Sequence, residues 1–363
     1  MESKELKELR RLANESRNPD ASIELILALS RAGAREEAVS RCRRLVRGEV
    51  RPEVLETAAR FLFEHKELES ARECFEHLAA TQDGRALPYY YLGRIHERMG
   101  DHLVAAEMHE RAIEVEPDNA ECYYRYGVTL AHRERRDDAE RYYRRAIALD
   151  QGHARAYTNL GCLLDMRGNG NAAIELFRKA LEHDPHSAEA HYNLGALYGE
   201  AGSHDRAIRE FMHAIRLQPE SVEANFNLGV AQFGQGDLAG AEESFRKVLK
   251  LDGSHQSAQF LIGMVYYRKG LYTRAIKVLQ QALKQDTENA SILYHIGVCY
   301  NRMDQPGKAI PPLKRVTELT PDDGRAYYYL GVVYDKSGMP DEARASYRAA
   351  DTRFQGGSAP NAA

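Results

Sequence analysis

The sequence predicts an all-α solenoid of about ten helix-turn-helix repeats, and two observations lead to this prediction. A large residue followed by glycine recurs every 34 residues, from Leu92-Gly93 to Leu330-Gly331, and an alanine follows each of these glycines by twelve residues. Apolar residues recur in both halves of each unit at the three- and four-residue spacing of amphipathic helices. Because a fixed period of this length marks stacked repeats, we expect one continuous stack instead of the two or three domains that 363 residues would suggest.

The period divides the chain into four predicted segments. In order, they are an N-terminal capping helix (1–18), two diverged hairpins (19–85), eight regular repeats (86–357) and a flexible tail (358–363). The capping helix is expected over residues 2–15, where an amphipathic pattern covers the exposed end of the stack. The diverged hairpins keep the apolar register, although Ala59 stands where the regular repeats have glycine.

Each regular repeat is expected to contain two helices separated by a short turn. Six of the eight units have glycine in that turn, and glycine readily takes the left-handed conformation that ends a helix. Pro311 and Pro312 conflict with the pattern because they fall beyond the first turn of a predicted second helix. We expect them to kink that helix or to delay its start.

The repeat pattern resembles the tetratricopeptide repeat. Numbered from the first residue of a unit, that family favours an aromatic at position 4, Leu-Gly at 7 and 8, Tyr at 11, Ala at 20 and 27, and Pro at 32. All eight regular units match the glycine at position 8 and the alanine at position 20. The resemblance implies a right-handed superhelix whose first helices line an inner groove, with positions 2, 5, 6, 9, 12 and 13 facing that groove.

Two rows of residues at these positions are candidates for binding a polypeptide. Position 6 is asparagine in three consecutive units, and position 5 is aromatic in seven of eight. The candidates are Asn159, Asn193 and Asn227, with the aromatics Tyr124, Tyr192, Phe226, Phe260 and Tyr294. An asparagine amide can pair with any peptide backbone, and the row resembles the asparagine ladder in the repeat arm of O-GlcNAc transferase. The alternative is that Tyr-Asn is simply the family consensus and that position 5 packs within its repeat.

Position 13 is basic in the last three units, where it is Arg268, Arg302 and Lys336. These residues could dock an acidic or carboxylate-ended ligand through charge-assisted hydrogen bonds. A solvated charge row is the competing interpretation. The carboxylate clamp of chaperone co-factors in this family needs lysine at position 5 and asparagine at position 9, and neither occurs in the regular repeats.

Composition argues against several other classes of protein. The net charge of −4 offers no general attraction to nucleic acid or anionic lipid, and no apolar run is long enough to span a membrane. Five scattered cysteines without a C-x-x-C pair suit a reducing compartment, so we expect a cytoplasmic protein. The Gly168-Asn-Gly170 run lacks the strand that a dinucleotide site needs, and His183, His186 and His191 have chance spacing, so neither a cofactor nor a metal is expected.

The sequence therefore favours a non-catalytic scaffold that binds a protein or an extended peptide. One alternative is the substrate-recognition subunit of a transferase whose catalytic domain lies on another chain. A second alternative is a helical-repeat protein that binds single-stranded nucleic acid, which the acidic balance of charge disfavours.

Overall fold

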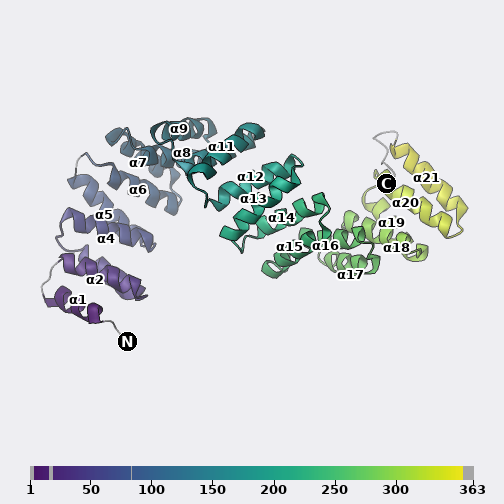
Figure 1. Ribbon diagram of the computed structural model, residues 1–363, viewed down its shortest axis with the longest axis horizontal. Helices are drawn as coiled ribbons and strands as arrows, with labels where there is room; N and C mark the ends of the chain where they lie inside the picture. Colours follow the sequence, from purple (N-terminus) through teal and green to yellow (C-terminus); the bar gives the residue numbers. More distant parts are fainter. Residues whose placement is uncertain (1–3, 16–18, 83, 355–363) are drawn as a thin grey trace. The chain divides into compact units, whose positions relative to one another are not determined.

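The computed structural model describes residues 4–15, 19–82 and 84–354, and these residues form 21 helices and no strand (Figure 1). They fall into two compact units, Met1–Pro185 and His186–Ala363, and each unit is described by itself. The all-α repeat solenoid expected from the period is confirmed. The predicted tail at 358–363 and the ends of the predicted capping segment, 1–3 and 16–18, lie outside the described residues.

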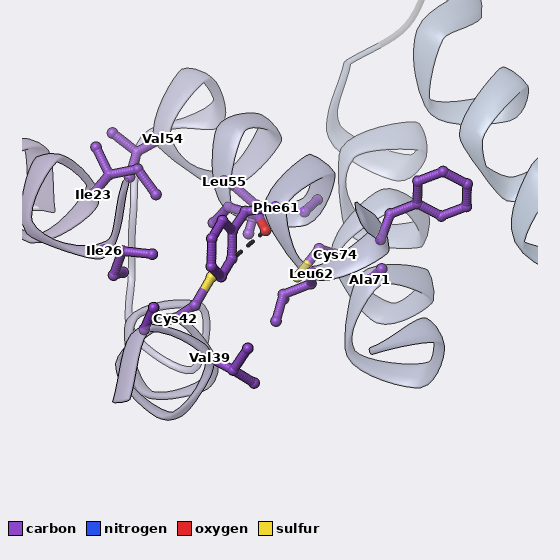
Figure 2. Close-up of a cluster of buried hydrophobic side chains, with 14 of the residues drawn as sticks. Ile23, Ile26, Val39, Cys42, Val54, Leu55, Phe61, Leu62, Ala71 and Cys74 are labelled. Atoms are coloured by element: carbon purple, nitrogen blue, oxygen red, sulfur yellow. Dashed lines mark hydrogen bonds between the residues drawn. The ribbon is translucent and has the colours of Figure 1, made fainter. Parts of the chain in front are cut away.

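The first unit holds eleven of the described helices. They are α1 (Lys4–Glu15), α2 (Pro19–Arg31), α3 (Arg35–Leu45), α4 (Pro52–Glu64), α5 (Leu68–Thr81), α6 (Ala86–Met99), α7 (His102–Val115), α8 (Ala120–His132), α9 (Arg136–Leu149), α10 (Ala154–Met166) and α11 (Gly170–His183). From α2 onward they pack as successive hairpins. In the first two hairpins, Ile26, Cys42, Leu62 and Cys74 meet in one core, where the Cys42 thiol donates to the carbonyl of Ala58 over 3.6 Å (Figure 2).

The second unit continues the same order with ten described helices. They are α12 (Ala188–Glu200), α13 (His204–Leu217), α14 (Val222–Gln235), α15 (Leu238–Leu251), α16 (Gln256–Arg268), α17 (Tyr272–Leu283), α18 (Ala290–Arg302), α19 (Pro306–Leu319), α20 (Gly324–Lys336) and α21 (Pro340–Phe354). Even-numbered helices are the first helices of their hairpins, and each packs against the odd-numbered helix that follows it.

Close approach of the two helices in a hairpin depends on the glycine at position 8. A Cβ added to Gly161 would lie 2.7 Å from the Phe177 ring, and one added to Gly229 would lie 2.6 Å from the Phe245 ring. Both phenylalanines are buried. The repeated glycine is therefore needed because the aromatic side chain of the second helix occupies the space of its missing side chain.

The turn between the two helices has the same left-handed backbone in all ten hairpins, with or without glycine. Seven hairpins have glycine there, with φ between +69° at Gly202 and +93° at Gly236. In the other three the residue is Lys66, Glu134 or Asp304, with φ of +66°, +59° and +55°. The packing of the hairpin therefore imposes this conformation even on residues that disfavour it.

The two internal prolines do not delay the start of their helix. Helix α19 begins at Pro306 and runs through Pro311 and Pro312 to Leu319, so the expectation of a late start was wrong. The physical reason is that Ala309, Leu313 and Val316 form a buried apolar stripe on this helix. Proline already has a φ near the helical value, so its cost is the lost hydrogen bond and local crowding, which burial of that stripe can offset.

Candidate binding face of the first helices

Consecutive first helices contact one another within each unit, as α6 and α8 do in the first and α12 and α14 in the second. Positions 2, 5, 6, 9, 12 and 13 of these helices form what we call the first-helix face. Capping side chains fix where several of these helices begin: Ser187 accepts from the Ala190 backbone N–H at 3.2 Å, and Ser221 from that of Ala224 at 3.1 Å. Equivalent positions of successive repeats are therefore held in register.

The predicted asparagines are half-buried on this face, and two of them bond to tyrosines of the preceding repeat within the same compact unit. In the second unit, Asn227 Nδ2 donates to the hydroxyl of Tyr192 on the preceding first helix, over 3.1 Å. In the first unit, Asn159 Nδ2 donates to the hydroxyl of Tyr143, a buried residue of α9, over 3.3 Å. Each bond fixes the amide plane and uses one of its two N–H groups, which leaves the other N–H and the carbonyl oxygen for a further partner.

The position-5 aromatics divide by burial. Tyr124 is 7% exposed and packs 4.8 Å from the His153 ring, so it contributes mainly to the interior of the first unit. Tyr192, Phe226, Phe260 and Tyr294 of the second unit are half-buried and keep part of their rings on the surface. The second unit therefore offers the larger aromatic surface among the predicted positions.

Three pockets open beside these residues in the second unit. A pocket of about 290 Å³ is lined by Asn227, Val230, Glu200 and His204. The other two measure about 270 and 300 Å³ and are lined in part by Tyr192 and by Phe260 respectively. Volumes at or just under the lower limit for small-molecule sites suit single side chains of a peptide better than a whole cofactor.

An aromatic cluster surrounds His295, which takes position 6 in the repeat that begins with α18. Its ring lies 5.6 Å from that of Phe260, 6.3 Å from that of Tyr267 and 5.2 Å from that of Tyr294. Burial lowers the pKa of His295 to about 4, and the charge of Arg325 lowers it in the same direction. The imidazole is therefore neutral near pH 7, and it can both donate and accept a hydrogen bond, as an asparagine amide does.

The three basic residues of position 13 are held differently from one another. Arg268 donates through Nη1 to the carbonyl of Phe233 over 2.8 Å and stacks 4.4 Å above the centroid of that ring. Lys336 donates to the carbonyl of Asn301 over 3.2 Å and lies 3.5 Å from a carboxylate oxygen of Asp304. Arg302 instead bonds to the Tyr267 hydroxyl, which raises the pKa of the arginine.

Two of these contacts follow a rule that we did not predict from the sequence. In each, the position-13 cation reaches back to the position-12 carbonyl of the preceding repeat, 35 residues earlier. Arg98 makes the same contact with Phe63 in the first unit, over 2.9 Å. We call this contact the backbone clip. Part of the basic row thus holds neighbouring repeats together.

A group of arginines on the first-helix face of the first unit was also not predicted from the sequence. Arg60, Arg94, Arg98 and Arg125 lie on α4, α6 and α8 among the rings of Phe63, Tyr90, Tyr91 and Tyr124. A signal was present, because Arg60 and Arg94 are 34 residues apart and both fall at position 9. It is visible only when charges are compared across equivalent positions of successive repeats.

Other groups with possible chemistry are accounted for by packing. Burial raises the pKa values of Cys42, Cys74, Cys122 and Cys299 to about 12, so these thiols are not poised as nucleophiles. In the part of the chain that the structure describes, no three His, Cys, Asp or Glu side chains are grouped to hold a metal ion. Of the helices described, none is both long and apolar enough to cross a membrane.

The hairpin stack and its first-helix face define a tetratricopeptide-repeat protein, a class of protein-interaction scaffold. A tetratricopeptide-repeat family model matches residues 90–154. The family model of the cilia and flagella-associated protein 70 C-terminal domain matches residues 129–363, which is well over half of the chain. The chain therefore belongs to that family.

Solved structures with similar folds were also found. YrrB, described as a TPR protein with an unusual peptide-binding site, is 25% identical over 51% of this chain and 95% of its own, with a TM-score of 0.47. MamA from Desulfovibrio magneticus RS-1 is 23% identical over 47% of this chain and 97% of its own, with a TM-score of 0.45. PilF from Pseudomonas aeruginosa is 22% identical over 56% and 93%, with a TM-score of 0.46. No curated protein sequence matched the chain significantly.

Proposed function

We propose that the protein is a non-catalytic scaffold that holds an extended polypeptide along the first-helix face of its second unit. The observation that carries the proposal is the Tyr192–Asn227 pair, which orients the amide at the edge of a pocket of about 290 Å³. A ligand backbone N–H donates to Asn227 Oδ1, and one ligand side chain enters the pocket beside it. This mode of binding recognises the ligand's main chain and therefore tolerates many ligand sequences.

The position-5 aromatics and His295 extend this mode of binding along the unit. Tyr192, Phe226, Phe260 and Tyr294 contribute apolar surface at successive repeats. His295 supplies a neutral imidazole at the position that asparagine takes in Asn193 and Asn227. Affinity then arises from several modest contacts, each backbone hydrogen bond contributing about 0.5–1.5 kcal/mol.

The basic residues near the C-terminal end of this face favour a ligand that is acidic or ends in a carboxylate. Arg302 is exposed and bonds to a phenol, and within the described part of the chain it has no carboxylate partner at ion-pairing distance. Its guanidinium keeps donors that fit a carboxylate in bidentate geometry. Arg268 and Lys336 add positive charge, although each also makes the backbone clip.

A display library of extended twelve-residue peptides tests the proposal. Peptides selected on the wild-type protein are measured by fluorescence anisotropy against an Asn193→Ala/Asn227→Ala variant and against Gln280→Ala, which removes an exposed amide from the second helix α17. We expect affinity to fall about 3- to 10-fold for each asparagine removed and to stay unchanged in the control. Equal affinity in all three proteins, with unfolding midpoints unchanged, would contradict the proposal.

A further inference from the structure

The arginines on the first-helix face of the first unit depart from the repeat pattern. Arg94 takes position 9, where every other regular repeat has a small or apolar residue. Those residues are Val128, Cys162, Ala196, Val230, Met264, Val298 and Val332. Arg60 takes the same position one repeat earlier, so two positive charges lie at equivalent positions of consecutive repeats.

Aromatic rings hold the Arg94 guanidinium in place. Its central carbon lies 4.7 Å from the Phe63 ring centroid and 5.4 Å from that of Tyr90, and Nη1 donates to the Tyr90 hydroxyl over 3.3 Å. Arg98 stacks on the same ring, with its central carbon 3.8 Å from the Phe63 centroid. Stacked arginines lose less freedom when they bind, because their planes are already oriented.

These two arginines have no carboxylate partner at ion-pairing distance among the residues that the structure describes. The neighbouring carboxylates bind other groups. Glu121 accepts from Arg125 at 3.0 Å and Arg155 at 2.7 Å, and Glu56 pairs with Arg60 and Arg85 at 2.7 and 2.9 Å. Glu97 accepts from His109 Nε2 at 3.1 Å and from the Thr129 hydroxyl at 2.6 Å.

The excess positive charge acts on the arginines themselves. Burial lowers the pKa of Arg98, and the nearby charges of Arg94 and Arg125 lower it further. A guanidinium remains protonated under all ordinary conditions, so this shift reports first the cost of partial burial and then like-charge repulsion, which Glu97 offsets in part. A bound anion would relieve the repulsion.

We propose that Arg94 and Arg98 form a binding site for an acidic segment of a partner polypeptide, with a ligand carboxylate bound by the Arg94 guanidinium. The inference rests on the proposed scaffold function and names the chemistry of a partner for the first unit. Separate carboxylates on a peptide fit a face on which Glu121 accepts from the same Tyr90 hydroxyl that Arg94 contacts and Glu97 acts on the charge of Arg98. A continuous phosphate backbone fits less well, since those glutamates and the net charge of −4 repel it.

The test uses the full chain and a fluorescein-labelled twelve-residue peptide of alternating Glu and Ser, with Gln-Ser as its neutral counterpart. Wild type is compared with Arg94→Gln, with Arg94→Lys, and with Arg111→Gln, which removes the same charge from an exposed site on the second helix α7. We expect Arg94→Gln to weaken binding of the acidic peptide about 10-fold and Arg111→Gln to leave it unchanged. Arg94→Lys should fall between them, because lysine keeps the charge and loses the planar fork.

Three results would overturn this inference: no binding of the acidic peptide to wild type, equal binding of the neutral peptide, or equal affinity in Arg94→Gln with an unchanged unfolding midpoint. Tighter binding of a twelve-residue oligouridylate than of the acidic peptide would also overturn it and indicate a nucleic-acid site. The peptides selected from the display library distinguish this outcome from a failure of the proposed function. Their loss of affinity for the Asn193→Ala/Asn227→Ala variant is expected whether or not Arg94 binds carboxylates.

Discussion

Replacing Glu134 by glycine should stabilise the protein, although no contact is added. Glu134 is exposed at the turn between α8 and α9, with φ of +59°, where seven other hairpins have glycine. Its backbone N–H donates to the Ala131 carbonyl over 3.0 Å, a bond that glycine keeps. The left-handed conformation costs a residue with a Cβ about 1–2 kcal/mol. Glycine loses about 0.5–1 kcal/mol more backbone entropy on folding, so the net gain is about 0.5–1 kcal/mol.

The assay is urea denaturation followed by circular dichroism, with Glu134→Ala as the matched control. Alanine removes the same charge and keeps a Cβ, so it should leave the unfolding free energy nearly unchanged. The reverse change, Gly168→Ala, should cost about 1 kcal/mol through the backbone alone, since φ is +77° and a Cβ there meets no atom within 4 Å. If alanine stabilised position 134 as much as glycine did, the effect would lie in the lost charge and the reasoning would be refuted.

Three further expectations concern the core, the thiols and the response to acid. Gly229→Ala should destabilise the protein by about 1–3 kcal/mol in urea denaturation, because its Cβ would meet a buried ring at 2.6 Å, whereas Gly253→Ala, with its nearest atom at 3.8 Å, should be tolerated. A thiol reagent at pH 8 should modify Cys162 first in the folded protein, since the other four cysteines are buried with pKa values of about 12; simultaneous modification of all five would contradict this. Burial raises the pKa of Glu121, but the hydrogen bond with His153 and the charges of Arg155 and Arg125 lower it by more, so that the pKa falls to about 2. Its contribution to stability is therefore present above pH 4.5 and is lost as the pH falls towards 2, so Glu121→Gln should flatten the acid limb of a stability profile over that range.

The hairpin stack could be predicted because the period repeats the same steric requirement in eight regular repeats. Glycine at position 8 and a large residue at position 24 are two halves of one contact, as in Gly229 and Phe245. The turn at Glu134 could not be predicted in the same way. Its sequence lacks the glycine that signals a left-handed residue, and the conformation follows from the packing of the helices on either side.

The candidate site was less accessible to sequence reasoning, because its residues act through partners in other helices. Asn227 was identified, but its bond to Tyr192 joins residues 35 apart on consecutive first helices. Arg94 was not predicted, because charge was compared across repeats only at position 13, whereas position 9 was considered only for the asparagine of a carboxylate clamp. Charges on a repeat protein can gather at any equivalent position of neighbouring repeats, which the linear sequence separates by 34 residues.

The backbone clip distinguishes cations whose replacement also loosens the contact between two repeats from cations whose replacement changes only the charge of the face. Arg98, Arg268 and Lys336 each donate to a carbonyl of the preceding repeat, so replacing any of them changes both the charge of the face and the attachment of two repeats. Arg94 and Arg302 bond to tyrosine hydroxyls instead, and no carbonyl of a neighbouring helix depends on them among the described residues. A loss of binding on replacing either of these two therefore reports recognition, whereas the same loss at a clip residue would be ambiguous. The cations at position 13 therefore serve two different roles, and among them only Arg302, which makes no clip, isolates the role that concerns ligands.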